Sequence, residues 1–175
     1  FARVNYNYKN RYLAEVNGRY DGSSNFPSHS RWAFFPSFSL GYRVSEEPFF
    51  APVKQVVSDM KIRGSYGLIG NQNVGADRFI PTMSTAYASW LVDGAKVLYT
   101  GLPANVSSSL YWEDVATLDI GVDLRFLGNK YGITFDWFQR TNRNMLSVGE
   151  TLPETFGTAA AMVNDGRLRT RGWEI

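Results

Sequence analysis

The sequence predicts an all-β fold, an antiparallel sheet of about seven strands that forms part of a transmembrane β-barrel. Large apolar and polar side chains alternate over segments of about 9 to 13 residues, longer than most strands of water-soluble domains. The 16 glycines, seven prolines and 15% aromatic residues favour strands and turns. We expect no helix longer than a turn or two.

Alternation with a period of two residues marks the first three strands. Residues 2–8 form the first strand, and the Lys-Asn dipeptide that follows is expected to form a tight turn. Residues 12–20 form the second strand, which ends at the turn signal DGSSN. Residues 31–44 form the third. Because proline lacks the N–H that a strand ladder needs, regular pairing there is expected to begin only after Pro36 or to pass through a bulge.

Four more strands are expected at residues 60–70, 116–126, 131–138 and from about Arg167 onward. A link with two prolines, residues 45–59, precedes the first of these strands. The turn LGNK has Gly128 and Asn129 available for the positive φ of a two-residue hairpin. Residues 70–112 and 141–166 are expected to be long irregular loops.

The lengths of the connections differ between the two ends of such a sheet. In an up-and-down arrangement alternate connections lie at the same end, so one end collects the short turns and the proline link. The long loops collect at the other end. Short turns at one end and long loops at the other are typical of outer-membrane barrels.

The apolar side chains face either lipid or a protein core, and the second possibility is a soluble β-sandwich or small barrel. Strand length favours lipid, since about 10 tilted residues cross the hydrocarbon layer. The opposite face carries Asp, Arg, Asn and Thr, as a water-filled lumen would. Aromatic residues near the strand ends resemble two interfacial girdles: Tyr6, Tyr8 and Tyr12 near a short turn, and Trp32, Phe34, Tyr111 and Trp112 near the loops.

Seven strands do not close such a barrel. An open sheet in lipid leaves unpaired backbone groups at both edges, each costing several kcal/mol. We therefore expect the chain to be a segment of a longer protein whose other strands complete the barrel.

Composition and motifs argue against several function classes. The net charge is +2 without a basic block, so nucleic acid is not an expected partner. Cysteine is absent, and the single histidine, His29, lies in a polar loop stretch, so we expect no metal site. Nucleophile-elbow and phosphate-loop motifs are also absent, and we expect neither a catalytic site nor a cofactor.

Five sequence blocks, in this order, carry a resemblance to a known family: YLAEVNGRYDGSSNF, RWAFFPSFSLGYRVSEE, MKIRGSYGLIGNQNV, YWEDVATLDIGVDLRFLGNKYGITFDWFQRTNRNML and NDGRLRTRGWEI. The chain resembles the barrel portion of SusC/RagA-type TonB-dependent outer-membrane transporters over most of its length. The resemblance implies a 22-stranded barrel in the Gram-negative outer membrane, of which residues 1–175 form part of the C-terminal barrel domain. It further implies a plug domain and a TonB box, which this sequence lacks.

The partners and cargo that the resemblance implies are a SusD-like surface lipoprotein, TonB acting through the N-terminal part, and glycans or peptides as substrates. The loop candidates for contact with ligand or lipoprotein are Tyr87, Trp90, Tyr99, Tyr111 and Trp112. The alternative for each of them is that its ring packs with the others or lies in the interfacial girdle. The lumen-facing candidates are Asp119, Asp123, Arg125, Asp136 and Arg140, with the aspartates either solvated or paired with the two arginines. The alternative function is a soluble carbohydrate-binding β-domain.

Overall fold

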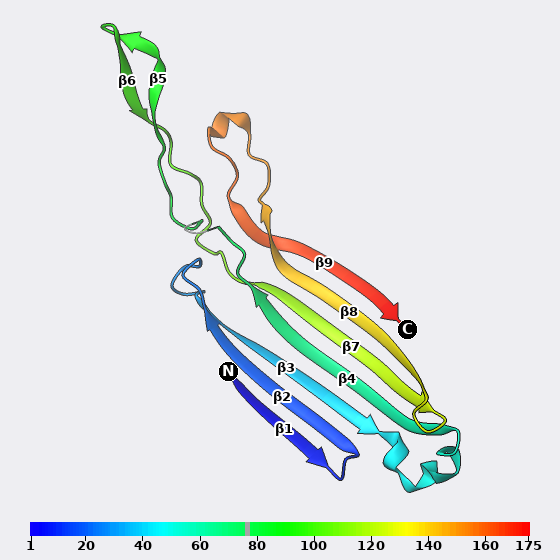
Figure 1. Cartoon of the computed structure of the whole chain (residues 1–175). Coiled ribbons are helices and arrows are strands. Elements are labelled where there is room, and N and C mark those ends of the chain that lie inside the picture. Colours follow the sequence, from blue (N-terminus) through cyan, green and yellow to red (C-terminus); the bar gives the residue numbers. More distant parts are fainter. Residues whose placement is uncertain (76–77) are drawn as a thin grey trace.

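The chain forms a seven-stranded antiparallel sheet and a separate two-stranded hairpin, in a computed structural model that describes residues 1–75 and 78–175. The sheet order is β1-β2-β3-β4-β7-β8-β9 (Figure 1). Its strands are β1 (Ala2–Tyr8), β2 (Tyr12–Gly22), β3 (Trp32–Arg43), β4 (Val57–Asn71), β7 (Glu113–Phe126), β8 (Tyr131–Val148) and β9 (Met162–Glu174). The hairpin is β5 (Thr85–Val92) and β6 (Ala95–Thr100). Three short 3-10 helices are η1 (Val44–Glu46), η2 (Pro48–Val53) and η3 (Glu154–Phe156).

The two ends of the sheet differ as the sequence predicts. The connections β1–β2, β3–β4 and β7–β8 lie at one end, which we call the turn end, and the β3–β4 link contains η1 and η2. The connections β2–β3, β4–β7 and β8–β9 lie at the other, the loop end. The hairpin β5–β6 belongs to the β4–β7 connection and stands away from the sheet at the loop end (Figure 1).

The predicted tight turn between β1 and β2 is confirmed. Lys9 and Asn10 both have positive φ (51° and 56°), and the Arg11 N–H donates to the Tyr8 carbonyl at 3.0 Å. The predicted two-residue LGNK turn is wrong in detail. Four residues connect Phe126 to Tyr131, and Leu127 joins Gly128 and Asn129 in the positive-φ region.

Two expected loops are more ordered than predicted. Strand β8 continues to Val148 and β9 begins at Met162, so the loop between them is shorter than residues 141–166. A register shift near Asn144, whose φ is 57°, interrupts the alternation that marks a strand in sequence. Residues 70–112 contain the β5–β6 hairpin, which side-chain alternation did not reveal because both of its faces carry exposed apolar residues. Residues 76 and 77 of this predicted loop lie outside the described residues.

The prediction for Pro36 holds on one side of β3. The ladder between β3 and β4 begins at Ser37↔Gly67, directly after the proline. The ladder between β2 and β3 continues through Gly18↔Pro36 without a register shift. The missing N–H is therefore tolerated where β3 has only one paired neighbour.

Strand register sorts the side chains onto two faces. The rows Val4–Val16–Phe38–Tyr66–Leu118 and Leu40–Gly64–Ile120–Trp137–Trp173 belong to one face, which we call the apolar face. The intervening rows Asn5–Glu15–Ser39–Ser65–Asp119 and Gly41–Arg63–Gly121–Asp136 belong to the polar face. The alternation read from single strands thus agrees across the whole sheet.

The buried core lies at the loop end. Phe26, Phe35, Val74, Leu110 and Trp112 form one cluster, which brings together the β2–β3 loop, β3 and both ends of the β4–β7 connection. Phe35 packs against Gly70 at a position where any Cβ would collide with its ring. The cluster holds the bases of the long loops against the sheet, and the strand faces below it remain open.

Candidate functional site

The apolar face of the sheet is uncovered in the described residues. Its side chains are exposed on every strand, among them Val4, Val16, Phe38, Leu40, Ile120, Phe135 and Trp173. The second sheet of the structure is the small hairpin β5–β6, and it stands away from the apolar face (Figure 1). A band of aromatic and branched apolar residues across seven strands suits hydrocarbon as its solvent.

Stacked aromatic rings lie at both ends of the apolar face. At the turn end the rings of Tyr12 and Tyr42 stack at 5.1 Å, and the Tyr12 hydroxyl donates to Glu47. At the loop end the rings of Tyr20 and Trp32 stack at 5.3 Å. Aromatic rings with one polar end are suited to the interface between hydrocarbon and water, as the predicted girdles require.

The apolar band runs obliquely to the rows of paired residues. At the loop end the last aromatic residue of the band is Trp32 on β3 and Trp173 on β9. These two residues do not share a row. Trp173 is in the row of Leu40, which lies eight residues after Trp32 on β3. At the turn end the boundary shifts the same way, from Tyr42 on β3 to Tyr131 on β8. A drift of one to two residues per strand corresponds to a tilt of about 35–55°, which brackets the tilt of membrane barrels.

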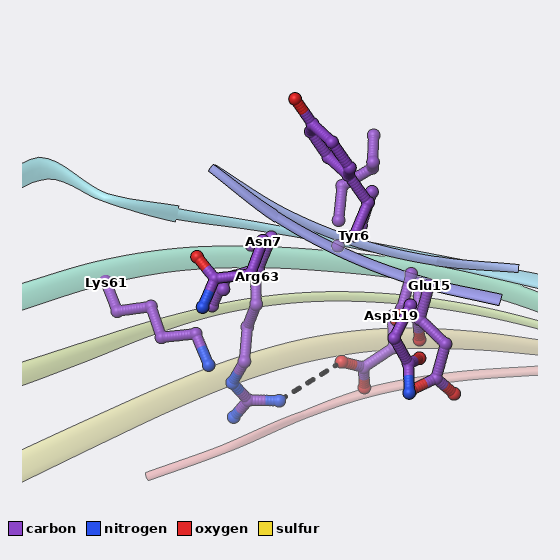
Figure 2. A pocket seen from close by; sticks show the side chains of 14 residues that line it. Tyr6, Asn7, Glu15, Lys61, Arg63 and Asp119 are labelled. Atoms are coloured by element: carbon purple, nitrogen blue, oxygen red, sulfur yellow. Dashed lines mark ion pairs between the residues drawn. The ribbon is translucent and has the colours of Figure 1, made fainter. Parts of the chain in front are cut away.

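The polar face is hollowed near its middle. A depression of about 440 Å³ is lined by Asn7, Glu15, Lys61, Arg63 and Asp119, with the backbones of β1 to β4 as its floor. Figure 2 shows Lys61, Arg63 and Asp119 on one side of the sheet and Tyr6 on the other. Polar side chains therefore surround an open space, as they do on the inner wall of a water-filled barrel.

Arg63 is the centre of the ion pairs on the polar face. Its Nη2 lies 2.7 Å from Asp136 Oδ2, its Nε 3.3 Å from Asp123 Oδ2 and its Nη1 3.6 Å from Asp119 Oδ1. The guanidinium thus connects β4 with β7 and β8. Its fork of donors suits several carboxylates at once, which the point charge of a lysine does not.

The structure corrects the expected partners of these aspartates. Within the described residues, Asp119, Asp123 and Asp136 form ion pairs with Arg63, and neither Arg125 nor Arg140 takes that role. Arg125 and Arg140 do lie on the polar face, opposite Asp59 and Thr117 respectively. Sequence reasoning missed Arg63. Its position on the polar side of the predicted strand 60–70 was the available signal.

Trp112 and Tyr111 differ in their surroundings. Trp112 is 5% exposed and packs against Phe26 and Phe35, and its indole N–H donates to the Arg31 carbonyl at 3.3 Å. The expectation that Trp112 contacts a ligand or belongs to the girdle is therefore wrong, because its ring is buried in the loop-end core. Tyr111 is partly exposed, and its hydroxyl lies 3.1 Å from Asn144 Oδ1.

The remaining aromatic candidates lie on the hairpin. Tyr87, Trp90 and Tyr99 are 69%, 61% and 47% exposed, and the rings of Trp90 and Tyr99 stack at 6.4 Å. Leu91 and Leu98 add exposed apolar surface to the same hairpin. We call these five residues, which lie on both faces of the hairpin, the hairpin patch. Its apolar area on a projecting two-stranded element is typical of a contact surface.

The described residues contain no group of three or more His, Cys, Asp or Glu arranged to hold a metal ion. They also include no helix of sufficient length and apolarity to span a membrane. The chemistry available to the polar face is ion pairing and hydrogen bonding with a polar solute or with another protein segment.

Comparison with known proteins decides whether the apolar face contacts lipid or the core of a soluble domain. A family profile described as "TonB dependent receptor-like, beta-barrel" matches residues 1–175. The chain belongs to the TonB-dependent receptors. It is 34% identical over 178 residues to the TonB-dependent receptor SusC of Bacteroides thetaiotaomicron, covering 100% of the chain and 18% of that protein. A TonB-dependent receptor of Formosa agariphila is 31% identical over 175 residues, which cover 100% of the chain and 17% of that protein.

Solved structures agree with this assignment. The RagAB peptide importer in its "closed-closed" state superposes with a TM-score of 0.80 at 23% identity, covering 98% of the chain and 18% of that chain. The RagAB peptide transporter superposes with a TM-score of 0.79 at 24% identity, with the same coverage of both chains. At this identity the likeness shows the fold, an open section of a β-barrel.

The chain is therefore a barrel segment of a SusC/RagA-type TonB-dependent receptor. It spans 17–18% of the length of the curated relatives that it matches. The soluble β-sandwich, which requires a second layer over the apolar face, is not supported. In a TonB-dependent receptor the apolar face is the outside of the barrel and the polar face is its inner wall.

Proposed function

We propose that this segment forms part of an outer-membrane transporter that imports glycans or peptides together with a SusD-like surface lipoprotein. The observation that carries the proposal is the seven-stranded apolar face, which is uncovered in the described residues and lies behind a polar, charge-paired inner wall. A RagAB peptide importer among the similar structures supports peptides as cargo, and the glycan alternative follows from the SusC/RagA-type resemblance.

In this proposal residues 1–175 belong to the C-terminal barrel domain in the outer membrane of a Gram-negative bacterium. A plug domain from the N-terminal part of the parent protein occupies the lumen, and TonB acts on that part. Side chains of the polar face, including Arg125 and Arg140, then face either the plug or the passing cargo. The loop end faces the cell exterior, because long loops are extracellular in such barrels.

The hairpin patch is proposed to contact the lipoprotein. The patch projects beyond the sheet at the loop end, and it combines stacked rings with aliphatic side chains, as the anchors of protein interfaces do. Tyr111, which is anchored at the base of the loops, is proposed to contact cargo at the mouth of the barrel.

The experiment that tests the function uses the full-length parent protein in its own host. The protein should fractionate with the outer membrane, require detergent for extraction and run as a heat-modifiable band in SDS gels. Deletion of its gene should abolish growth on the glycan or peptide that the system imports. Extraction in plain buffer as a soluble monomer that binds sugar would support a soluble carbohydrate-binding β-domain instead.

Co-purification with the lipoprotein tests the hairpin patch. The double variant Trp90→Ser/Tyr99→Ser should lose at least about tenfold in lipoprotein recovery, because two aromatic anchors of an interface are removed. Phe156→Ser is the matched control, since Phe156 is an exposed aromatic residue of a different loop. Equal recovery of the lipoprotein with both variants would contradict a role for the patch.

A further inference from the structure

Four arginines lie at the loop end of the outer surface of β8 and β9. Arg169 and Arg171 are paired opposite Thr141 and Gln139, which share the apolar face with Trp137. Arg143 lies opposite Asp114 on the same face, and Arg167 continues the alternation along β9. We call Arg143, Arg167, Arg169 and Arg171 the arginine band. All four are exposed.

The band begins directly above the lipid-facing residues. Trp137 and Trp173 are paired across β8 and β9, and Arg171 is the next outward residue on β9 toward the loop end. Tryptophan on the outer surface of a membrane barrel marks the level where hydrocarbon meets headgroups. At about 3.3 Å per residue, Arg171 to Arg167 covers about 13 Å along the strand above that level.

Arg169 and Arg171 have no carboxylate opposite them in the sheet, since their partners are Thr141 and Gln139. Among the ion pairs of the described residues, none includes a member of the band. Arg171 donates to the neutral amide of Gln139 at 2.8 Å. Asp114 lies opposite Arg143 and offsets part of the charge of that one arginine, while it also accepts a hydrogen bond from Asn144 at 3.0 Å.

The outer surface beside Arg169 suits the flat headgroup of a lipid rather than an acyl chain inserted between side chains. Thr141, opposite Arg169, is 3% exposed, and Ala116 beside it is 4% exposed. Both short side chains stand in one row between longer neighbours, Leu68 on β4 and Arg169 on β9. The result is a shallow cationic surface whose planar guanidinium groups match phosphate oxygens.

We propose that the arginine band binds the phosphate groups of an outer-leaflet lipid headgroup and so ties a lipid to this side of the barrel. The proposal rests on the proposed membrane orientation, in which the loop end faces outward. It assigns the band to lipid rather than to cargo, because the band lies on the outside of the wall. The cargo route lies inside.

The experiment uses the full-length parent protein in detergent, with diphosphoryl lipid A as the probe and native mass spectrometry to count bound lipid. The triple variant Arg167→Gln/Arg169→Gln/Arg171→Gln should weaken lipid A binding by at least about tenfold, since each basic residue at an anionic membrane surface contributes a roughly fivefold factor. Arg140→Gln is the matched control, because Arg140 lies on β8 but faces the lumen. It should bind lipid A as the wild type does.

Two further arms identify the occupant. Dephosphorylated lipid A should bind the wild type and the triple variant equally weakly, and millimolar inorganic phosphate should not displace diphosphoryl lipid A. Equal binding of diphosphoryl lipid A to the wild type and the triple variant would overturn the proposal. Displacement by inorganic phosphate at that level would also overturn it, since the site would then recognise free anions.

Heat modifiability of each variant separates this proposal from the proposed function. If the triple variant still forms a heat-modifiable barrel and binds lipid A as the wild type does, the proposal for the arginine band fails. The proposed transport function is not affected by that result. If the triple variant does not insert, salt titration of the wild type decides. Binding should weaken as salt rises to about 1 M, where the screening length falls to about 3 Å, and binding that does not respond to salt overturns the proposal.

Discussion

Arg63 on β4 and Asp136 on β8 meet across the strand that separates them, with Arg63 Nη2 2.7 Å from Asp136 Oδ2. Both are paired with Gly121 on β7, which lies between them in the same row. A Cβ on Gly121 would collide with a carboxylate oxygen of Asp136 and lie 2.8 Å from Arg63 Cζ. The absence of a side chain at Gly121 is what permits ion pairing between next-but-one strands.

Gly121→Ala should separate Arg63 from Asp136 and lower the free energy of unfolding by about 1–3 kcal/mol, the cost of losing a charge-assisted hydrogen bond. The measurement is urea unfolding of the full-length protein in detergent, followed by tryptophan fluorescence. Gly132→Ala is the control, since the nearest atom to its added Cβ lies at an ordinary contact distance of 3.8 Å. Similar losses in both variants would refute the steric argument.

Arg63→Gln should destabilise the barrel more than Arg125→Gln does. Removal of the Arg63 guanidinium leaves Asp119, Asp123 and Asp136 without their shared cation, at a cost of about 1–3 kcal/mol in this partly exposed setting. Arg125 has no ion pair among the described residues, so its loss should cost no more than about 0.5 kcal/mol. The same unfolding experiment measures both, and a larger effect at Arg125 would be the contrary result.

Ile120→Arg should impair insertion into the outer membrane, whereas its neighbour Asp119→Asn should not. Ile120 lies on the apolar face, where a charge at mid-membrane costs about 2–4 kcal/mol. Asp119 faces the lumen, and its neutralisation leaves Arg63 with two carboxylates. The amount of heat-modifiable protein in the outer membrane reports the difference, and equal yields would count against the assignment of the faces.

Trp112→Ala should loosen the loop end without preventing barrel formation. A buried tryptophan truncated to alanine costs about 3–5 kcal/mol, and here the loss falls on the cluster that anchors the long loops. Limited trypsin digestion on intact cells should therefore cut faster after Arg78 and Lys96. Met83→Ala removes an exposed apolar side chain from the same connection, outside the hairpin patch, and should leave the cleavage rate unchanged. Unaltered digestion of the Trp112 variant would show that the cluster does not anchor the loops.

The sequence was sufficient to predict the parts of the fold that depend on local pattern. Alternation along 116–126 and 131–138 identified both the strands and their faces, because the side-chain period of a strand is two residues. The Arg63 cluster was not predictable in this way. It joins residues 56 to 73 positions apart, and its partners depend on strand register and on the missing side chain at Gly121.

The loops were less predictable for two different reasons. Trp112 follows a polar, turn-rich stretch, and nothing local distinguishes a buried indole from one at the interface. Its burial comes from Phe26 and Phe35, which are far away in sequence. The hairpin β5–β6 has apolar residues on both faces, so it lacks the alternation by which the other strands were recognised.

The oblique course of the apolar band means that neighbours in a hydrogen-bonded ladder do not share a membrane depth. Leu40 and Trp173 belong to one row, but Leu40 lies beside the tyrosines of the turn end and Trp173 beside the arginines of the loop end. Spin labels at these two positions would sample opposite leaflets. A substitution scan of this wall has to be ordered by height along the bilayer normal, and a scan ordered by strand pairing would mix tolerant and intolerant sites.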